Sequence, residues 1–97
     1  MDSDAQIFQK IRTFFKDKPV KKVYVFGSFA RGESQINSDI DLYLELDYQH
    51  NPGLAFYGWF EQLKELLHID VDLVTTNSAS AYIKPFIEQD KRLIYER

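Results

Sequence analysis

Apolar residues recur along this chain at helical and at strand spacing, which predicts alternating helices and strands. Ser3 and Gln6 have the pattern of a capping box, and the apolar residues after them predict a helix from about Asp4 to Phe15. Pro19 ends this helix, because a residue before proline disfavours helical geometry. The β-branched and aromatic residues from Lys22 to Phe26 predict a strand buried on both faces.

The rest of the chain continues this alternation. From Asp39 to Leu46, polar and apolar residues alternate one by one, which is the clearest strand pattern in the sequence. An apolar stripe at helical spacing from Phe56 to about His68 predicts a helix, and Ile69 to Thr75 a further strand. The series is completed by a short helical stretch that Pro85 interrupts or restarts, and by a short strand from Arg92 to Tyr95.

This order predicts an α/β (α+β) fold with a small mixed sheet of about four strands and helices packed on one face. The helix between the strands at 39–46 and 69–75 permits a crossover, which would make these strands parallel neighbours. Their polar residues would leave the other face open and acidic. With 97 residues and no repeat or linker, we expect a single domain over residues 1–97.

Composition limits the partners and the compartment. The net charge of −3 and the absence of a basic stripe argue against nucleic acid or an anionic membrane as a partner. The chain has no cysteine, no signal-peptide core and no run of membrane-spanning length, so we predict a cytoplasmic protein. Aromatic residues are frequent, and we expect Tyr57 or Trp59 either to face a partner protein or to complete the core and its rim.

The segment VYVFGSFARGES, residues 23–34, has P-loop spacing when it is counted from Gly27, but Glu33 stands where a P-loop has lysine. A glutamate there would repel phosphates, and the long amphipathic helix that follows a P-loop is missing. The P-loop interpretation therefore fails. A turn of Gly27 and Ser28 directly after a strand is still a suitable phosphate cradle, through its backbone N–H groups and hydroxyl.

Acidic residues gather on the predicted open face. Asp39 and Asp41 are two positions apart on a strand, so both side chains leave the same face. The parallel neighbour would add Asp72, or with less support Asp70. Three adjacent carboxylates repel one another unless a cation lies between them, and Mg²⁺ is the natural choice for carboxylate oxygens. The alternative is a solvated acidic surface without a ligand.

Together, residues 27–33, 38–42 and 71–74 resemble the signature of the DNA polymerase beta-type nucleotidyltransferase superfamily. Their spacing is similar to that of its minimal branch, the MNT proteins that are often paired with a HEPN-domain toxin. The resemblance implies a palm-like fold and a Mg²⁺-dependent nucleotidyltransferase. It further implies transfer of a nucleoside monophosphate, AMP from ATP, to a tyrosine of a cognate HEPN toxin. The chain would then act as an antitoxin.

The resemblance also implies roles for single residues. Asp39, Asp41 and Asp72 would be the catalytic residues and the ligands of two Mg²⁺ ions. Gly27 and Ser28 would hold phosphates of the nucleoside triphosphate. The resemblance thus implies that the cofactor ATP is bound by Gly27, Ser28 and Arg31.

Several points stay open at this level. Arg31 and Glu33 could contact nucleotide, or could instead form an ion pair or a helix cap, and Asp70 could flank the metal site. The protein could neutralise its partner by binding alone, or could modify a small hydroxylated molecule. The base preference, the number of nucleotides transferred and the oligomeric state, a homo-oligomer included, are not determined by the sequence.

Overall fold

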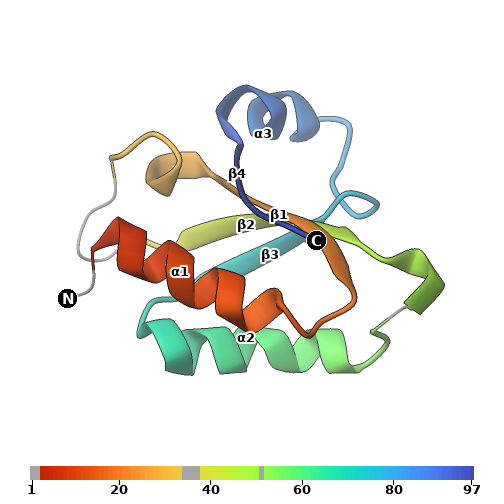
Figure 1. The fold of residues 1–97 in the computed structure, drawn as a ribbon. Helices are drawn as coiled ribbons and strands as arrows, with labels where there is room; N and C mark the ends of the chain where they lie inside the picture. The colour runs from red at the N-terminus through yellow and green to blue at the C-terminus, as the bar shows by residue number, and fades with distance from the viewer. Residues whose placement is uncertain (1–2, 34–37, 51) are drawn as a thin grey trace.

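The computed structural model describes residues 3–33, 38–50 and 52–97 and contains a four-stranded sheet in the order β3-β2-β1-β4 (Figure 1). The strands are β1 (Val20–Phe26), β2 (Ile40–Leu46), β3 (Val71–Thr75) and β4 (Arg92–Glu96). β1 runs antiparallel to both β2 and β4, whereas β2 and β3 are parallel. The predicted crossover between parallel neighbours is therefore confirmed.

Two helices, α1 (Asp4–Phe15) and α2 (Ala55–Leu67), pack side by side on one face of the sheet (Figure 1). The capping box predicted at the start of α1 is present, with Gln6 N donating to Ser3 Oγ at 3.2 Å and Ser3 N donating to Gln6 Oε1 at 2.8 Å. Each helix buries one apolar stripe against the strands, formed by Ile7, Ile11 and Phe15 in α1 and by Trp59, Leu63 and Leu67 in α2.

The position of Trp59 decides between the two interpretations of these aromatic residues. Trp59 is only 2% exposed and packs edge-on against Phe15 of α1, with ring centroids 5.7 Å apart. It precedes Leu63 by four residues and so belongs to the buried stripe. Tyr57, by contrast, is 69% exposed. Only Tyr57 of the two is available to a partner.

The third helix, α3 (Lys84–Asp90), lies on the opposite side of the sheet from α1 and α2 (Figure 1). Ile87 of α3 and Tyr43 of β2 are both buried, and the Lys91 ammonium lies 4.5 Å from the ring centroid of Tyr24. The fold class is as predicted, but the helices are not confined to one face. In the alternating strand pattern, Tyr43 stands at a position expected to face water, but α3 covers its large aromatic ring.

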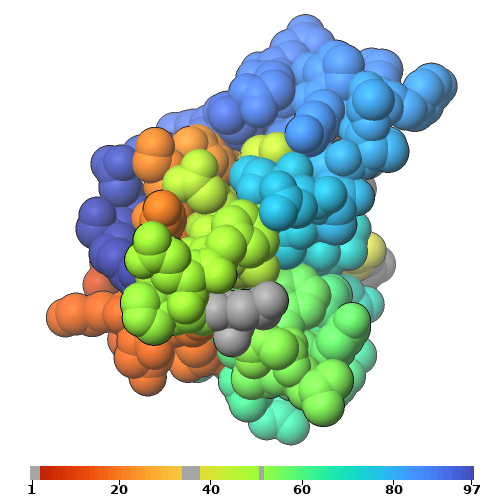
Figure 2. Space-filling model, turned by 90° about the vertical axis from the view of Figure 1, so that its right-hand side faces the viewer, coloured from red at the N-terminus to blue at the C-terminus, as the bar shows by residue number. Residues whose placement is uncertain are grey.

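The connection from β3 to α3 projects from the body of the molecule together with the start of the helix (Figure 2). Pro85 lies in the first turn of α3, where its missing N–H has no helical partner to lose. It therefore starts the helix instead of interrupting it. Within the described residues, none of the helices combines the length and apolarity needed to span a bilayer.

Candidate active site

The structure brings Asp39, Asp41 and Asp72 together at one end of the parallel strand pair. Asp41 and Asp72 are register partners on β2 and β3, and Asp39 directly precedes β2 on the same face. At the start of β2, the backbone N–H of Ile40 donates to the carbonyl of Asp70 at 3.0 Å. We call Asp39, Asp41 and Asp72 the acidic edge.

Asp41 is the most enclosed member of the acidic edge. It is partly buried, whereas Asp39 and Asp72 are exposed. Burial raises the pKa of the Asp41 carboxyl above its usual value, and the neighbouring charges of Asp72 and Asp39 raise it further. Its negative charge is thus unfavourable in the isolated protein, and a cation between the carboxylates would relieve this cost.

The acidic edge lines an open hollow of about 450 Å³ at the border of the sheet. The opposite wall comes from α2 and from the start of β3, with Phe60, Glu61, Lys64, Asp70 and Val71. A second hollow of about 570 Å³ also contains Asp39, together with Ser38 and the last turns of α2. A solute can therefore reach the carboxylates from the side of β3.

Sequence reasoning did not identify Lys64, which lies in the same hollow as the acidic edge. Its Nζ lies 3.1 Å from Asp70 Oδ1, and both side chains are more than half exposed. The hydrogen bond and charge of Asp70, with the charge of Glu61, raise the pKa of Lys64. Asp70 thus faces a cation of its own chain. The signal in the sequence was the short separation along the chain between Lys64 and the two aspartates.

Gly27 fixes the predicted phosphate turn directly against Asp41. Phe26, the residue before it, is the register partner of Asp41, and Gly27 adopts a φ of +74°. A Cβ at Gly27 would lie 2.5 Å from Asp41 Oδ2, so no other residue fits there without displacing that carboxylate. The turn of Gly27 and Ser28 and the acidic edge therefore form one site.

Arg31 extends from the same turn but contacts carboxylates of its own chain. Its Nη1 lies 2.6 Å from Asp90 Oδ2 at the end of α3, and its Nε lies 3.1 Å from Glu33 Oε2. Hydrogen bonds from Arg31 to Glu33 and to Asp90 raise the pKa of the guanidinium. The ion pair that the sequence left open for Arg31 and Glu33 is therefore present, and a nucleotide-binding role of Arg31 stays a prediction.

The donor set of the acidic edge consists of carboxylate oxygens, which are ligands that Mg²⁺ prefers. In residues 3–33, 38–50 and 52–97, no three acidic or histidine side chains converge closely enough to hold a metal ion. Burial of Asp41 and its repulsion by Asp72 and Asp39 nevertheless favour a hard cation at this position.

Comparison with known proteins identifies the family of the chain. The family model described as polymerase beta, nucleotidyltransferase, matches residues 9–97. A putative protein adenylyltransferase of Methanocaldococcus jannaschii is 41% identical over 93 residues, which cover 93% of this chain and 91% of that protein.

Solved structures show the same fold. A toxin–antitoxin complex with AMP-PNP contains a chain with a TM-score of 0.79 and 26% identity, and the match covers 93% of this chain and 73% of that one. A complex of the tri-AMPylated HEPN toxin of Shewanella oneidensis with an MNT antitoxin gives a TM-score of 0.75 at 22% identity, covering 98% and 74%. The predicted nucleotidyltransferase fold is confirmed by these likenesses.

Proposed function

The chain belongs to the polymerase beta nucleotidyltransferase family, and we propose that it transfers AMP from ATP to a tyrosine of a HEPN-domain toxin and so acts as an antitoxin. The observation that carries the proposal is the close approach of the Gly27 backbone to Asp41, which puts the turn predicted to bind phosphate beside a cluster of carboxylates. The adenylyltransferase name of the Methanocaldococcus jannaschii relative supports a protein acceptor. The toxin–antitoxin complex with AMP-PNP supports an adenine nucleotide and a toxin partner.

Asp39, Asp41 and Asp72 are the residues that would hold Mg²⁺ once their side chains draw closer together, because they offer carboxylate oxygens on one face. Burial and the charges of Asp72 and Asp39, which raise the pKa of Asp41, favour a cation there. Two such ions, when bound, would lower the pKa of the acceptor hydroxyl and neutralise the leaving pyrophosphate.

The protein's own contribution is mainly positioning. Gly27 brings the backbone of the turn within contact distance of Asp41, and the N–H groups and hydroxyl of Ser28 are suited to hold phosphate oxygens there. The α-phosphate of a nucleotide held in this way would lie over the acidic edge. Holding both reactants in line with each other supplies much of the rate enhancement in phosphoryl transfer.

The acceptor would enter from the side of β3, the strand at the end of the sheet. Asp72 is exposed on that strand and lies opposite Asp41, so an incoming hydroxyl meets it before it reaches the partly buried carboxylate. The hollow is open to a large partner as well as to a small one. The relatives' names favour the protein partner.

The experiment that tests the proposal distinguishes the two ends of ATP. The protein is incubated with a HEPN-domain partner, Mg²⁺ and ATP labelled on either the α- or the γ-phosphate. We expect label on the partner from α-labelled ATP alone, and none with the Asp39→Asn or Asp41→Asn variant. An inhibitory complex without label, formed equally well by Asp39→Asn, would replace catalysis with neutralisation by binding.

Other expectations stay predictions. These are a single domain over residues 1–97, a cytoplasmic location, and the absence of nucleic acid or membrane as partners.

A further inference from the structure

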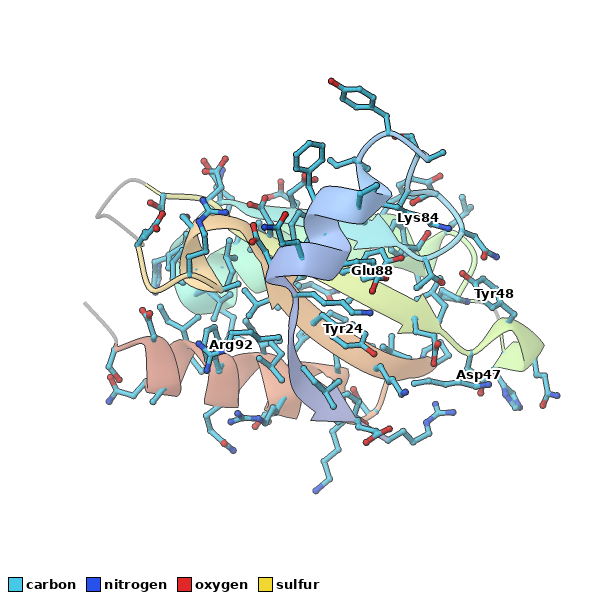
Figure 3. The ribbon with its side chains drawn as sticks, turned by 90° about the horizontal axis from the view of Figure 1, so that it is seen from above. Tyr24, Asp47, Tyr48, Lys84, Glu88 and Arg92 are labelled. Atoms are coloured by element: carbon cyan, nitrogen blue, oxygen red, sulfur yellow. The ribbon has the colours of Figure 1, made fainter. Side chains whose placement is uncertain are left out.

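Two arginines connect the segment 27–33, here called the glycine loop, to the junction of α3 and β4. Arg31 Nη1 of the loop donates to Asp90 Oδ2 at 2.6 Å. A second hydrogen bond has its donor on β4 and its acceptor in the loop: Arg92 Nη1 at the start of β4 donates to the carbonyl of Ala30 at 3.4 Å (Figure 3). Asp90 and Arg92 are only two residues apart, so one short stretch of chain makes two contacts with the loop.

Hydrogen bonds within the glycine loop transmit this anchor to the phosphate turn. The backbone N–H of Arg31 donates to the carbonyl of Gly27 at 3.2 Å, and that of Glu33 donates to the carbonyl of Ser28 at 2.9 Å. The Gly27 backbone approaches Asp41 closely, since a Cβ on Gly27 would lie 2.5 Å from Asp41 Oδ2. A displacement of Arg31 would therefore shift the backbone that faces the acidic edge.

The two carboxylates that contact Arg31 differ in what they connect. Glu33 belongs to the glycine loop itself, and its contact at 3.1 Å spans only two residues. Asp90 belongs to α3, lies 59 residues further along the chain, and its side chain is only 24% exposed. Of these two contacts, only the one with Asp90 fixes the loop to another element.

From this arrangement we infer that Arg31 is a positioning residue, which through Asp90 holds the glycine loop against Asp41 and does not itself bind the nucleotide phosphates. This replaces the ATP-binding role that the sequence suggested for Arg31. The inference rests on the proposed function in one respect, the use of the loop as a phosphate site. The anchor itself is measurable without nucleotide.

Three substitutions separate anchoring from binding. Asp90→Asn breaks the connection to α3, and Arg31→Gln removes the same ion pair from the other side. Glu33→Gln is the matched control, because it also removes one negative charge beside Arg31 but leaves the contact with Asp90 in place. The double variant Arg31→Gln with Asp90→Asn completes a cycle that reports whether the two residues act as a unit.

The first measurement is amide hydrogen exchange in the intact protein without nucleotide. We expect Asp90→Asn and Arg31→Gln each to accelerate exchange at the amides of Arg31 and Glu33 about three- to fivefold, the range that an exposed ion pair supports. The double variant should exchange no faster than either single variant, and Glu33→Gln should match the wild type. Unchanged exchange in Asp90→Asn would overturn the anchor, whether or not the protein binds ATP.

The second measurement is calorimetric titration with AMP-PNP and Mg²⁺. We expect Asp90→Asn to weaken binding about as much as Arg31→Gln, and Glu33→Gln to leave the Kd within about twofold. If Arg31→Gln weakens binding strongly while Asp90→Asn binds like the wild type, Arg31 contacts the phosphates directly and the inference is wrong. A wild-type protein that binds no AMP-PNP would instead count against the proposed function, while the exchange data still decide on the anchor.

Discussion

Strand β2 has an aspartate near each end, and the two are in opposite environments. Asp41 near the start is partly buried beside Asp39 and Asp72, and burial and their charges raise its pKa. Asp47 directly after the last residue is 5% exposed, and hydrogen bonds from Arg97 and His50 lower its pKa to about 2. A structural carboxylate is thus surrounded by donors. Asp41, the carboxylate proposed to bind a ligand, instead lies among other acids.

The surroundings of Asp47 show what the acidic edge lacks. Asp47 Oδ2 lies 2.8 Å from Arg97 Nη1 and 3.0 Å from His50 Nδ1, and its backbone N–H donates to Pro19 O at 2.8 Å. Arg97 also donates to Lys18 O at 3.2 Å. We call Asp47, His50 and Arg97 the Asp47 cluster. It joins β2, the end of β4 and the segment before β1 at the end of β2 far from the acidic edge (Figure 3).

The largest difference between the two ends of β2 should appear in activity. Asp41→Asn is expected to lower the rate of AMP transfer by on the order of 10³-fold, because it removes a charge that the metal ions need. The same change removes the repulsion from Asp39 and Asp72, so the melting temperature at pH 7 should stay equal or rise. Initial transfer rates and thermal melts of the same preparation check both statements, and a variant with the wild-type rate would refute the metal assignment.

Gly27→Ala is the next largest expected effect. A Cβ there would collide with Asp41 Oδ2 at 2.5 Å and would strain a residue with φ of +74°, so we expect about a 10²-fold loss of transfer and a stability cost of roughly 1–3 kcal/mol.

Gly32→Ala is the matched control for Gly27→Ala. Gly32 has a φ of +71°, but among the described residues beyond its chain neighbours no heavy atom lies within 4 Å of its Cβ position, so its substitution brings backbone strain without that collision. We expect a similar loss of stability in urea unfolding and a transfer rate within a few-fold of wild type. Equal losses of activity in both variants would show that strain, and not the contact with Asp41, is decisive.

Asp47→Asn tests the other end of β2 with the same chemical change as Asp41→Asn. It weakens the bonds to Arg97 and His50, so the melting temperature should fall by several degrees. Transfer measured well below the melting temperature should stay within about twofold of wild type, because the Asp47 cluster does not line the hollow at the acidic edge. A strong loss of activity in the folded variant would contradict the division between the two ends.

The smallest effect is the dependence of stability on pH, and its sign differs between the two aspartates. Asp47 has a lowered pKa, so its stabilisation is present above the ordinary value of 3.8 and is lost as the pH falls toward about 2. Asp41 has a raised pKa, so its destabilisation is present above that raised value and disappears as the pH falls through it toward 3.8. Urea unfolding from pH 7 to pH 2 should therefore show Asp41→Asn converging with wild type at a higher pH than Asp47→Asn.

Local patterns predicted much of the site. The capping box gave α1 its observed start, and alternation together with a crossover helix placed Asp72 opposite Asp41. β1 begins two residues before the expected strand, at Val20, and β3 begins two residues after the expected start, at Val71. Both strands end where they were expected to end. Such features depend on neighbours in the chain or on regular strand pairing.

The remaining features depend on contacts between distant residues. Asp90 meets Arg31 across 59 positions and Arg97 meets Asp47 across 50, and no periodic pattern encodes either pair. For the same reason, the alternation around Tyr43 gave no sign that α3 would cover it. The aromatic run at residues 56–60 was compatible with more than one buried stripe, and packing against Phe15 selected Trp59.

Thermal melting with Mg²⁺ and AMP-PNP tests most directly whether Asp41 is kept for a bound cation and nucleotide. The wild type and Asp47→Asn should both gain several degrees on addition of the pair, because ligands that bind only the folded state stabilise it. Asp41→Asn should start at an equal or higher melting temperature than the wild type and gain little. An Asp41→Asn protein that gains as many degrees as the wild type would contradict the account.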